Sequence, residues 1–265
     1  MKGIPVKARV PLIFLAAATL TLTACGGGGG DSEAGDNELG LVEAGSLTVC
    51  SDIPYAPFEF EEGGEYTGFD IDLIREVAKG MDLELSIKDV GFDGLQSGAS
   101  LAAGQCDLGA SAMSITEDRK KNLTFSDPYY DSQQSLMVPK DSDIKSIEEL
   151  EGKTVGVQQG TTGEDYTREN VPESTEVKAY PSDAELFPAL QSGGVDAVLQ
   201  DLPVNILHTE DGAFTIVEEY PTDEQYGFAM KKEGSEKLAE AVNESLAEVK
   251  DKGTYDEIYN KYFKE

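Results

Sequence analysis

The chain has 265 residues, of which 39% are hydrophobic, and its formal net charge is −30 at pH 7. This length allows one large domain or two small ones, and the apolar content is sufficient for a packed core. The charge argues against nucleic acid as a partner, because phosphate binding needs a basic surface. The acidity by itself indicates only solubility or adaptation to a salty environment.

The N-terminal pattern is typical of an export signal. Three basic residues within the first nine precede an apolar run at residues 12–22, which is too short to be a good bilayer span. The letters LTAC, ending at Cys25, resemble the lipobox of bacterial lipoproteins, whose cysteine is lipidated and becomes the first residue of the mature chain. The alternative is an ordinary cleaved signal with an incidental cysteine. We predict a lipoprotein signal peptide at residues 1–24 and lipidation of Cys25.

A flexible tether is predicted at residues 25–40, because this stretch is rich in glycine and acidic residues and offers little to bury. Ordered structure is expected to begin near Leu39. No second long apolar run follows, so we expect the protein to meet the membrane only through its N-terminal lipid.

Strand and helix patterns alternate along the rest of the chain. Strands are predicted at residues 47–50, 84–88, 107–110, 136–138, 153–157, 176–180, 195–199, 214–217 and 226–230. Helices are predicted at residues 71–81, from about residue 93, from residues 161 and 182, and in two segments near the C-terminus. This alternation predicts parallel sheets covered by helices on both faces, and its restart near Pro139 predicts two α/β lobes.

A short repeat supports two related lobes. The letters LQSG occur at residues 95–98 and again at residues 190–193, and each copy precedes a predicted strand. Polar residues follow both strands, at the ends where open α/β sheets bind ligands. Two lobes that present such ends to each other form a cleft, although the repeat alone is equally consistent with chance similarity between two helix ends.

Cys50 and Cys106 are the two cysteines that follow the predicted lipidation site. An exported protein meets an oxidising environment, so the two form a disulfide if their strands are neighbours and otherwise stay as separate buried thiols. The single histidine, His208, is predicted to lie at the surface. With one histidine and no CxxC spacing, we expect neither a metal site nor a cofactor.

Arg119 is the first candidate for ligand contact. It follows a strand end with two small polar residues, Ser111 and Ser114, and Thr116 has the position of an N-cap for a helix with Arg119 in its first turn. Free N–H groups at a helix start favour an anion, and a guanidinium offers two parallel hydrogen bonds to a carboxylate. The alternative is that Arg119 pairs with a surface acid.

The second lobe offers a similar strand end. Residues 157–163, VQQGTTG, run from a strand through a glycine turn to a helix start, where Thr161 and Thr162 can cap the helix or donate hydrogen bonds. The spacing does not match a phosphate-binding loop. Asp201 follows another strand and precedes Pro203, so it either caps the next helix or acts as the counter-ion of an ammonium group.

Strand exits of the first lobe supply further candidates. Asp52 and Tyr55 follow the first strand, and Phe92 lies in the exit loop after the strand at residues 84–88. Aromatic residues in such places usually belong to the core, but two at facing exits can enclose a flat or aliphatic ligand side chain.

Five segments resemble, in order, the solute-binding proteins of polar amino-acid ABC transporters, which form family 3 of the bacterial extracellular solute-binding proteins. They are SDIPYAPFEF, GFDIDLIREVAK, ASAMSITEDRKKNLTFSDPYY, GVQQGTTGEDY and VDAVLQD, and the resemblance extends over residues 47–263. It implies a two-lobe α/β fold of the periplasmic-binding-protein type (venus flytrap, type II) with hinge strands at residues 136–138 and 226–228. The first lobe then comprises residues 41–136 and 228–265, and the second comprises residues 137–227.

The resemblance also implies roles for individual positions. Arg119 is expected to clamp the α-carboxylate of an amino acid, and Asp201 to hold its α-ammonium group. Further contacts are implied as hydrogen bonds from Ser111, Ala112, Ser114 and Thr162, an aromatic pair from Tyr55 and Phe92, and a contact of Asp52 to a side-chain amine. Gln158, which stands where some members have lysine, and Thr161 are also expected to contact the ligand. Residues 94–107 form a slightly longer stretch than in familiar members, which affects the register near Phe92 and the recognition of the ligand side chain.

The function implied is that of a lipid-anchored, monomeric receptor outside the cytoplasm that delivers a polar amino acid to an ABC permease. Asp52 and Asp201, without a second cation in the cleft, favour a basic or neutral polar ligand over glutamate. The main alternative is an enzyme, because dehydratases of prephenate-like acids share this fold. Such an enzyme needs a general acid in the cleft, and we interpret Glu164 and Asp165 as surface acids at a helix start. A sensor ectodomain is a further alternative, but no transmembrane helix or kinase follows Glu265.

Overall fold

The computed structural model describes residues 38–263. The predicted signal peptide, Cys25 and most of the predicted tether lie outside the described residues. None of the helices within residues 38–263 combines the length and the apolar character that crossing a bilayer requires.

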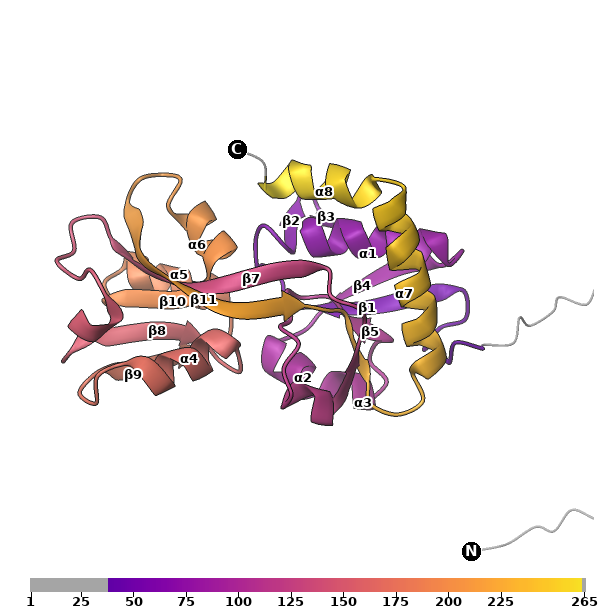
Figure 1. The fold of residues 1–265 in the computed structure, drawn as a ribbon, viewed down its shortest axis with the longest axis horizontal. Coiled ribbons are helices and arrows are strands. Elements are labelled where there is room, and N and C mark those ends of the chain that lie inside the picture. Colours follow the sequence, from indigo (N-terminus) through magenta and orange to yellow (C-terminus); the bar gives the residue numbers. More distant parts are fainter. Residues whose placement is uncertain (1–37, 264–265) are drawn as a thin grey trace, which may run out of the picture. The chain divides into compact units, whose positions relative to one another are not determined.

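The first lobe is built on a five-stranded sheet with the strand order β4-β1-β5-β12-β6 (Figure 1). Its strands are β1 (Ser46–Ser51), β4 (Glu84–Asp89), β5 (Leu108–Gly109), β6 (Leu123–Phe125) and β12 (Ala229–Lys231). The helices are α1 (Phe69–Gly80), α2 (Phe92–Gln96), α3 (Ala99–Ala102), α7 (Glu236–Asp251) and α8 (Thr254–Phe263), with a hairpin of β2 (Phe60–Glu62) and β3 (Glu65–Thr67). Successive side chains of β1 enter different cores, because strand residues alternate between faces: Val49 packs with α1, α7 and α8, whereas Cys50 packs with α2 and α3.

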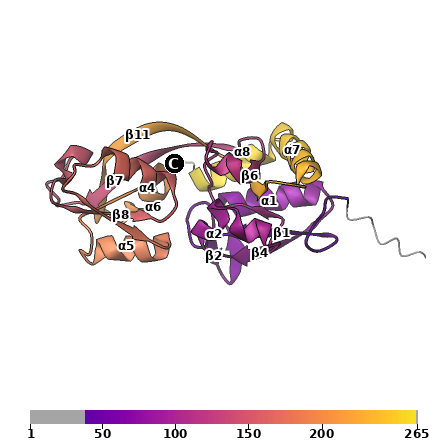
Figure 2. The ribbon, with the colours of Figure 1, turned by 90° about the horizontal axis from the view of Figure 1, so that it is seen from below.

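The second lobe is built on another five-stranded sheet, with the order β11-β7-β10-β8-β9. Its strands are β7 (Tyr130–Pro139), β8 (Thr154–Gln158), β9 (Glu176–Tyr180), β10 (Ala197–Asp201) and β11 (Phe214–Tyr226). Its helices are α4 (Thr162–Asn170), α5 (Asp183–Gln191) and α6 (Leu202–His208), with a 3₁₀ turn η2 (Ile147–Leu150). Figure 2 shows α4 and α5 on opposite sides of this sheet, and the two cores agree: Leu186 of α5 packs with Val198, whereas Tyr166 of α4 packs beside Leu199. The predicted two-lobe α/β fold is thus confirmed.

The sheets are mixed, and the prediction of parallel sheets was wrong in this respect. β1 pairs in parallel with β4 and β5, and β10 in parallel with β8, but β12, β7 and β11 pair antiparallel with their neighbours. β7 and β11 run side by side over many residues (Figure 1). They carry the chain out of the first lobe and back again, so one of them must oppose the other.

β11 is a single strand of 13 residues, where the sequence predicted only its first four residues and its last. Its middle part is acidic and contains Pro221, which weakens a strand signal. It is the edge strand of its sheet, where one side of the ladder is open and proline is tolerated. Register shifts interrupt its pairing with β7 between Ile216 and Glu218 and between Tyr220 and Glu224.

The passage between the lobes lies a few residues earlier than predicted on both strands. Leu136, placed in a hinge by the sequence, pairs with Leu199 of β10 and belongs to the second core. Tyr130 still packs in the first core, so the chain changes lobe between Tyr130 and Leu136. On the return strand Tyr220 belongs to the second core and Tyr226 to the first, so the second passage precedes Tyr226.

The LQSG repeat corresponds to equivalent places in the two lobes. Each copy ends a helix, α2 or α5, with a glycine of positive φ, 80° in the first lobe and 73° in the second. Downstream, the carboxylate of Asp107 accepts a hydrogen bond from the amide of Thr48 at 2.7 Å, and that of Asp196 from the amide of Thr154 at 2.8 Å. In both lobes an aspartate before a central strand thus fixes the start of the neighbouring strand.

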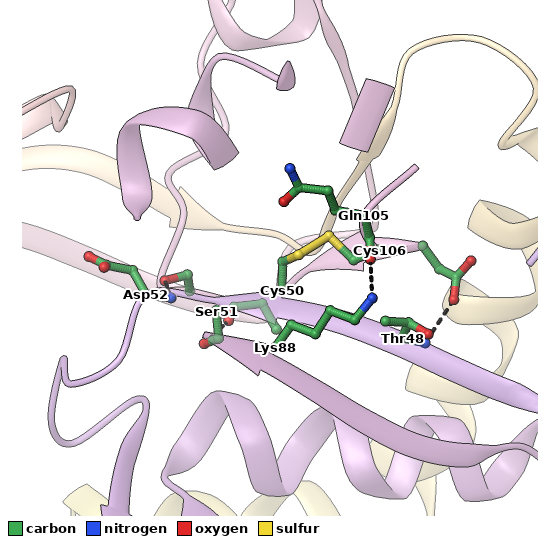
Figure 3. Close-up of a disulfide and its surroundings, with 10 residues drawn as sticks. Thr48, Cys50, Ser51, Asp52, Lys88, Gln105 and Cys106 are labelled. Carbon is green, nitrogen blue, oxygen red and sulfur yellow. Dashed lines mark hydrogen bonds between the residues drawn. A yellow bond between two sulfur atoms is a disulfide. The ribbon is translucent and has the colours of Figure 1, made fainter. Parts of the chain in front are cut away.

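Cys50 and Cys106 are joined by a disulfide across the first sheet (Figure 3). Cys50 lies in β1 and Cys106 just before β5, and these strands are neighbours. Both cysteines are buried in the core beneath α2 and α3. The bridge therefore ties together two strands whose exits carry candidate site residues.

Replacing both cysteines with alanine should lower the free energy of unfolding by about 4 kcal/mol, because the bridge closes a loop of 56 residues in the unfolded chain. Urea unfolding followed by circular dichroism measures the change. A reductant should destabilise the wild type by a similar amount and leave the double variant unaffected. Equal stability of the two proteins without reductant would contradict the expectation.

Candidate ligand-binding site

One cavity brings together strand exits of both lobes. The first lobe contributes from the exits of β1 and β5 and from α2, and the second from the ends of β8 and β10 and the start of α4. Its lining consists of Asp52, Tyr55, Phe92, Ser111, Ala112, Ser114, Arg119, Gln158, Thr161, Thr162 and Asp201. All eleven are residues that the sequence analysis proposed for ligand contact; whether a ligand touches them stays a prediction.

Arg119 is buried in this cavity and reaches both lobes. Its Nη1 donates to the carbonyl oxygen of Ser114 at 2.8 Å, and its Nη2 donates to that of Gly160 at 3.0 Å. The guanidinium lies over the ring of Phe92, 5.3 Å from its centre. Burial lowers the pKa of Arg119, while the charges of Glu224 and Asp201 oppose this effect. A guanidinium stays protonated in proteins, so Arg119 is a buried cation with further N–H groups for a ligand.

The helix predicted to begin at Thr116 is only a 3₁₀ turn, η1 (Arg119–Lys121). The hydroxyl of Thr116 accepts a hydrogen bond from the amide of Arg119 at 3.1 Å, so it does hold the start of this turn. Three residues make no macrodipole, so the anion-attracting group that this turn places in the cavity is the guanidinium of Arg119.

Asp201 is a buried carboxylate opposite Arg119. The hydroxyl of Tyr55 donates to its Oδ2 at 2.7 Å, and Nε2 of Gln134 donates to its Oδ1 at 2.6 Å. Burial raises the pKa of Asp201 to about 7, and the negative charge of Glu224 adds to the shift. Asp201 precedes α6 but makes no side-chain cap there, so its oxygens are directed to the cavity contacts.

Asp52 supplies another buried acid at the exit of β1. Nε2 of Gln158, from the end of β8, donates to its Oδ2 at 2.6 Å. Burial raises the pKa of Asp52 to about 7, although this hydrogen bond favours the ionised form. The Asp52–Gln158 and Tyr55–Asp201 bonds both join residues of different lobes, so the lobes meet through polar side chains.

Glu224, a second acid near Asp201, was not predicted from the sequence. Its carboxylate accepts hydrogen bonds from the hydroxyl of Ser114 in the first lobe and from that of Thr162 in the second, the latter at 2.6 Å. Nε2 of Gln134 also donates to it, at 3.0 Å. Glu224 therefore links both lobes from the strand that returns between them. The only signal was an acid in a segment that looked extended, which does not show where the side chain points.

Two further acids that were not predicted, Glu59 and Asp70, accept hydrogen bonds from residues that follow β5. The hydroxyl of Ser111 donates to Glu59 Oε1 at 2.6 Å, and the amide of Ala112 donates to Asp70 Oδ2 at 2.8 Å. Glu59 and Asp70 have no solvent exposure. Their only signal was an acid between aromatic and aliphatic residues, in PFEF and in GFDIDL, and this pattern does not show that the acid is buried.

At the start of α4, Thr161 is a helix cap whose hydroxyl accepts a hydrogen bond from the amide of Glu164 at 3.1 Å. The carboxylate of Glu164 accepts a hydrogen bond from the amide of Gly160 at 2.7 Å and forms an ion pair with Arg168. These bonds form a capping box shifted to the preceding turn, and they engage both oxygens of Glu164. This acid therefore shapes the turn whose carbonyl binds Arg119.

His208 is not the surface residue that we predicted. Its ring stacks on Phe187 with centroids 3.7 Å apart, and Nε2 lies 3.0 Å from Asp183 Oδ2. It is a packing residue of the second lobe and is not among the residues that line the cavity. Within residues 38–263 no group of His, Cys, Asp and Glu side chains is arranged to hold a metal ion.

The cavity thus contains a buried cation from the first lobe and a buried acid, Asp201, from the second lobe, and the two do not touch. A guanidinium can bind a carboxylate, and Asp201 can bind an ammonium group. Phe92 and Tyr55 add apolar ring surface beside them. These groups suit a small zwitterion, and the hydroxyls of Ser114 and Thr162 add adaptable hydrogen bonds.

Comparison with known proteins agrees with this chemistry. Residues 47–265 match the model of bacterial extracellular solute-binding proteins, family 3. The ABC transporter glutamine-binding protein GlnH of Bacillus subtilis is 36% identical over 260 residues, covering 94% of each chain. The probable histidine-binding protein of Neisseria gonorrhoeae is 33% identical over 258 residues, covering 94% of this chain and 93% of the relative. A solved structure of an ancestral arginine-binding protein bound to glutamine has a TM-score of 0.79 and 39% identity, covering 84% of this chain and all of that one.

Tyr55→Phe should lower the free energy of unfolding by about 1–3 kcal/mol, because it leaves a buried carboxylate oxygen of Asp201 without its donor. Chemical denaturation measures the effect. Tyr66→Phe is the matched control, since the hydrogen bond of Tyr66 uses its backbone carbonyl. Equal losses in the two variants would show that the Tyr55–Asp201 bond does not stabilise the arrangement.

Proposed function

We propose that this chain, which belongs to family 3 of the bacterial extracellular solute-binding proteins, captures a polar amino acid outside the cytoplasm and delivers it to an ABC permease. Relatives named as glutamine-binding and histidine-binding proteins support amino-acid capture. The observation that carries the proposal is the burial of Arg119 and Asp201 in one cavity between two lobes. A zwitterionic ligand compensates both charges at once.

Each cavity group receives a role from its chemistry. Arg119 binds the α-carboxylate with N–H groups that its two carbonyl partners leave available. Asp201 binds the α-ammonium group, and Ser111, Ala112, Ser114 and Thr162 donate or accept further hydrogen bonds. Tyr55 and Phe92 enclose the ligand side chain. Asp52 and Gln158 contact the polar group at the end of that side chain. Thr161 fixes the turn that presents Thr162.

A basic or neutral polar ligand fits the charges best. Asp52, Asp201 and Glu224 lie in or beside the cavity with Arg119 as its cation. Once the α-carboxylate neutralises Arg119, a second carboxylate on glutamate would meet acids alone. Arginine, lysine, histidine or glutamine avoids this repulsion.

Ligand capture proceeds by closure of the lobes. Two side-chain bonds, Tyr55–Asp201 and Gln158–Asp52, and the Arg119–Gly160 bond cross between them. A ligand that contacts both lobes favours the closed arrangement over an open one by its differential affinity. The permease then distinguishes the loaded from the unloaded protein by the relative position of the lobes.

The membrane attachment proposed is a lipid on Cys25, followed by a tether. It rests on the LTAC pattern and the glycine-rich stretch, which lie outside the described residues. The protein acts as a monomer held at the outer side of the cell membrane. Globomycin treatment of expressing cells should retain the precursor if this attachment is correct.

The family and the named relatives are binding proteins, which disfavours the enzyme alternative. Glu164, which the sequence suggested is a surface acid at a helix start, uses its two oxygens to bind the Gly160 amide and Arg168. Turnover of a prephenate-like acid by the purified protein would revive that alternative.

Calorimetric titration with the amino acids tests the proposed function. The protein is first unfolded and refolded to remove any ligand that co-purifies. Binding of at least one of arginine, lysine, histidine and glutamine, with no binding of glutamate, is the expected result. Tight binding of glutamate with no response to the other four would overturn the charge argument.

Arg119→Ala should weaken binding of the best ligand by about 30-fold to several thousand-fold, since truncating one partner of a buried charge pair costs about 2–5 kcal/mol. The same titration measures it. Arg75→Ala is the control, because Arg75 lies exposed on α1 and pairs with Asp72 there. If Arg119→Ala binds as tightly as Arg75→Ala, the guanidinium is not the carboxylate clamp.

Affinity for a cationic ligand should rise as the pH rises toward about 7. The pKa of Asp201 is about 7 in the ligand-free cavity, and an ammonium partner lowers it, so binding expels a proton below that pH. The bound state holds fewer protons, and the affinity therefore increases as pH rises. Titrations in buffers of different ionisation enthalpy measure the released protons. Asp201→Asn should bind weakly and release fewer protons; undiminished release would point to another group.

A further inference from the structure

Glu59 and Asp70 form a buried acid pair beneath the cavity. Each uses one carboxylate oxygen: Glu59 Oε1 accepts from the hydroxyl of Ser111, and Asp70 Oδ2 accepts from the amide of Ala112 and the hydroxyl of Tyr129. The other oxygens, Glu59 Oε2 and Asp70 Oδ1, are buried without a hydrogen-bond partner. Two buried orphan oxygens would be costly if both groups were ionised.

The two acids come from adjoining segments. The amide of Asp70, in the first turn of α1, donates to the carbonyl of Phe58 at 3.0 Å. Their charges act on each other, since Asp70 raises the pKa of Glu59 in addition to the effect of burial. Burial likewise raises the pKa of Asp70. Like charges that share a buried site keep a proton on one member.

The pair holds a strained part of the site. Ala112 has a φ of 43°, in the left-handed region that a residue with a Cβ rarely adopts. Its amide is bound by Asp70, and the preceding Ser111 is bound by Glu59. The hydroxyl of Ser111 also accepts a hydrogen bond from the amide of Asp52 at 3.1 Å, so the exits of β5 and β1 are tied to the same support.

We propose that Glu59 and Asp70 share one proton between their two unpartnered oxygens and act as positioning residues that hold Ser111 and Ala112 for the ligand. The shared proton satisfies both oxygens and leaves a single negative charge. The proposal rests on the proposed function, because it specifies what fixes one wall of that binding site.

The surroundings of the pair give the direction of its pH response. Asp52 from the exit of β1 and Asp201 from β10 act on Glu59, and Tyr129 before β7 binds Asp70. Tyr55 lies near Glu59, and the charge of Glu59 raises the pKa of the Tyr55 hydroxyl. These neighbours are acids and phenols, so they oppose loss of the shared proton. Once it is lost at alkaline pH, the two carboxylates repel, the support of Ala112 fails, and ligand affinity falls.

Amide substitutions test the shared proton without changing size. In Glu59→Gln the amide nitrogen can donate permanently to Asp70 Oδ1, while the amide oxygen still accepts from Ser111. In Asp70→Asn the amide nitrogen donates to Glu59 Oε2, while the oxygen still accepts from Ala112. In the double variant the two amide nitrogens face each other, and no orientation satisfies all four bonds.

Isothermal titration with the best-binding amino acid should show both single variants within a few-fold of the wild type near neutral pH. The double variant should bind at least about tenfold more weakly, a coupling that independent steric effects do not produce. As the pH rises above neutrality, the affinity of the wild type should fall at least about tenfold relative to that of Glu59→Gln, because only the wild type can lose the shared proton. Titration of the ligand's own ammonium group is common to both proteins and cancels in this ratio.

Single variants as weak as the double variant, or a constant wild-type to Glu59→Gln ratio across the pH range, would overturn the proposal. If the double variant does not fold, the pH ratio of the two folded proteins decides. If the wild type binds no amino acid, the proposed function fails, and the pair is then judged by unfolding. A protonated Glu59 predicts that the stability of the wild type falls relative to Glu59→Gln as pH rises from about 5 to about 8, and equal slopes would refute it.

Discussion

The cost of burying charge governs the site between the two lobes. An isolated charge in a protein interior is unfavourable unless it is paired or hydrogen-bonded. Arg119 is compensated by two carbonyl oxygens, a ring face and the field of acids on the other lobe. Asp201 is compensated by a phenol and an amide. Neither group touches an opposite charge directly, so a ligand that supplies both completes the pairing.

Hydroxyls and amides, rather than ion pairs, join the lobes around these charges. Each such contact stabilises only modestly, because folding or closure replaces bonds to water with these bonds. An interface of this kind can open at a small cost in free energy. For the same reason, its contacts alone do not hold the lobes closed when no ligand is bound. Glu224 shows the principle, because its carboxylate gathers hydroxyl donors from both lobes while it lies on the connecting strand. Closure is therefore sensitive to small changes in charge within the cavity.

The fold and the cavity lining were largely predictable, because periodicity marks the strands and ligands bind at strand exits. The lining residues, including Thr162 and Asp201, were identified from the motif around Arg119 and from the family resemblance. The full length of β11 was not predictable, because its acidic, proline-containing middle has no apolar alternation. Glu59 and Asp70 were missed since a buried acid beside aromatic residues reads as an exposed acid at a turn or helix start. Burial of polar residues is decided by tertiary partners, which a single sequence does not display.

The way the chain visits its lobes has a consequence for how it folds. The second lobe is one continuous stretch inserted between β6 and β12, so its sheet can assemble from neighbouring parts of the chain. The first lobe needs β12, α7 and α8, which come last, to complete its sheet and its larger core. Contacts between distant segments form slowly because a long loop must close first. The inserted lobe is thus free to become native early, whereas the half that carries Arg119 acquires its final packing only when the C-terminal helices dock.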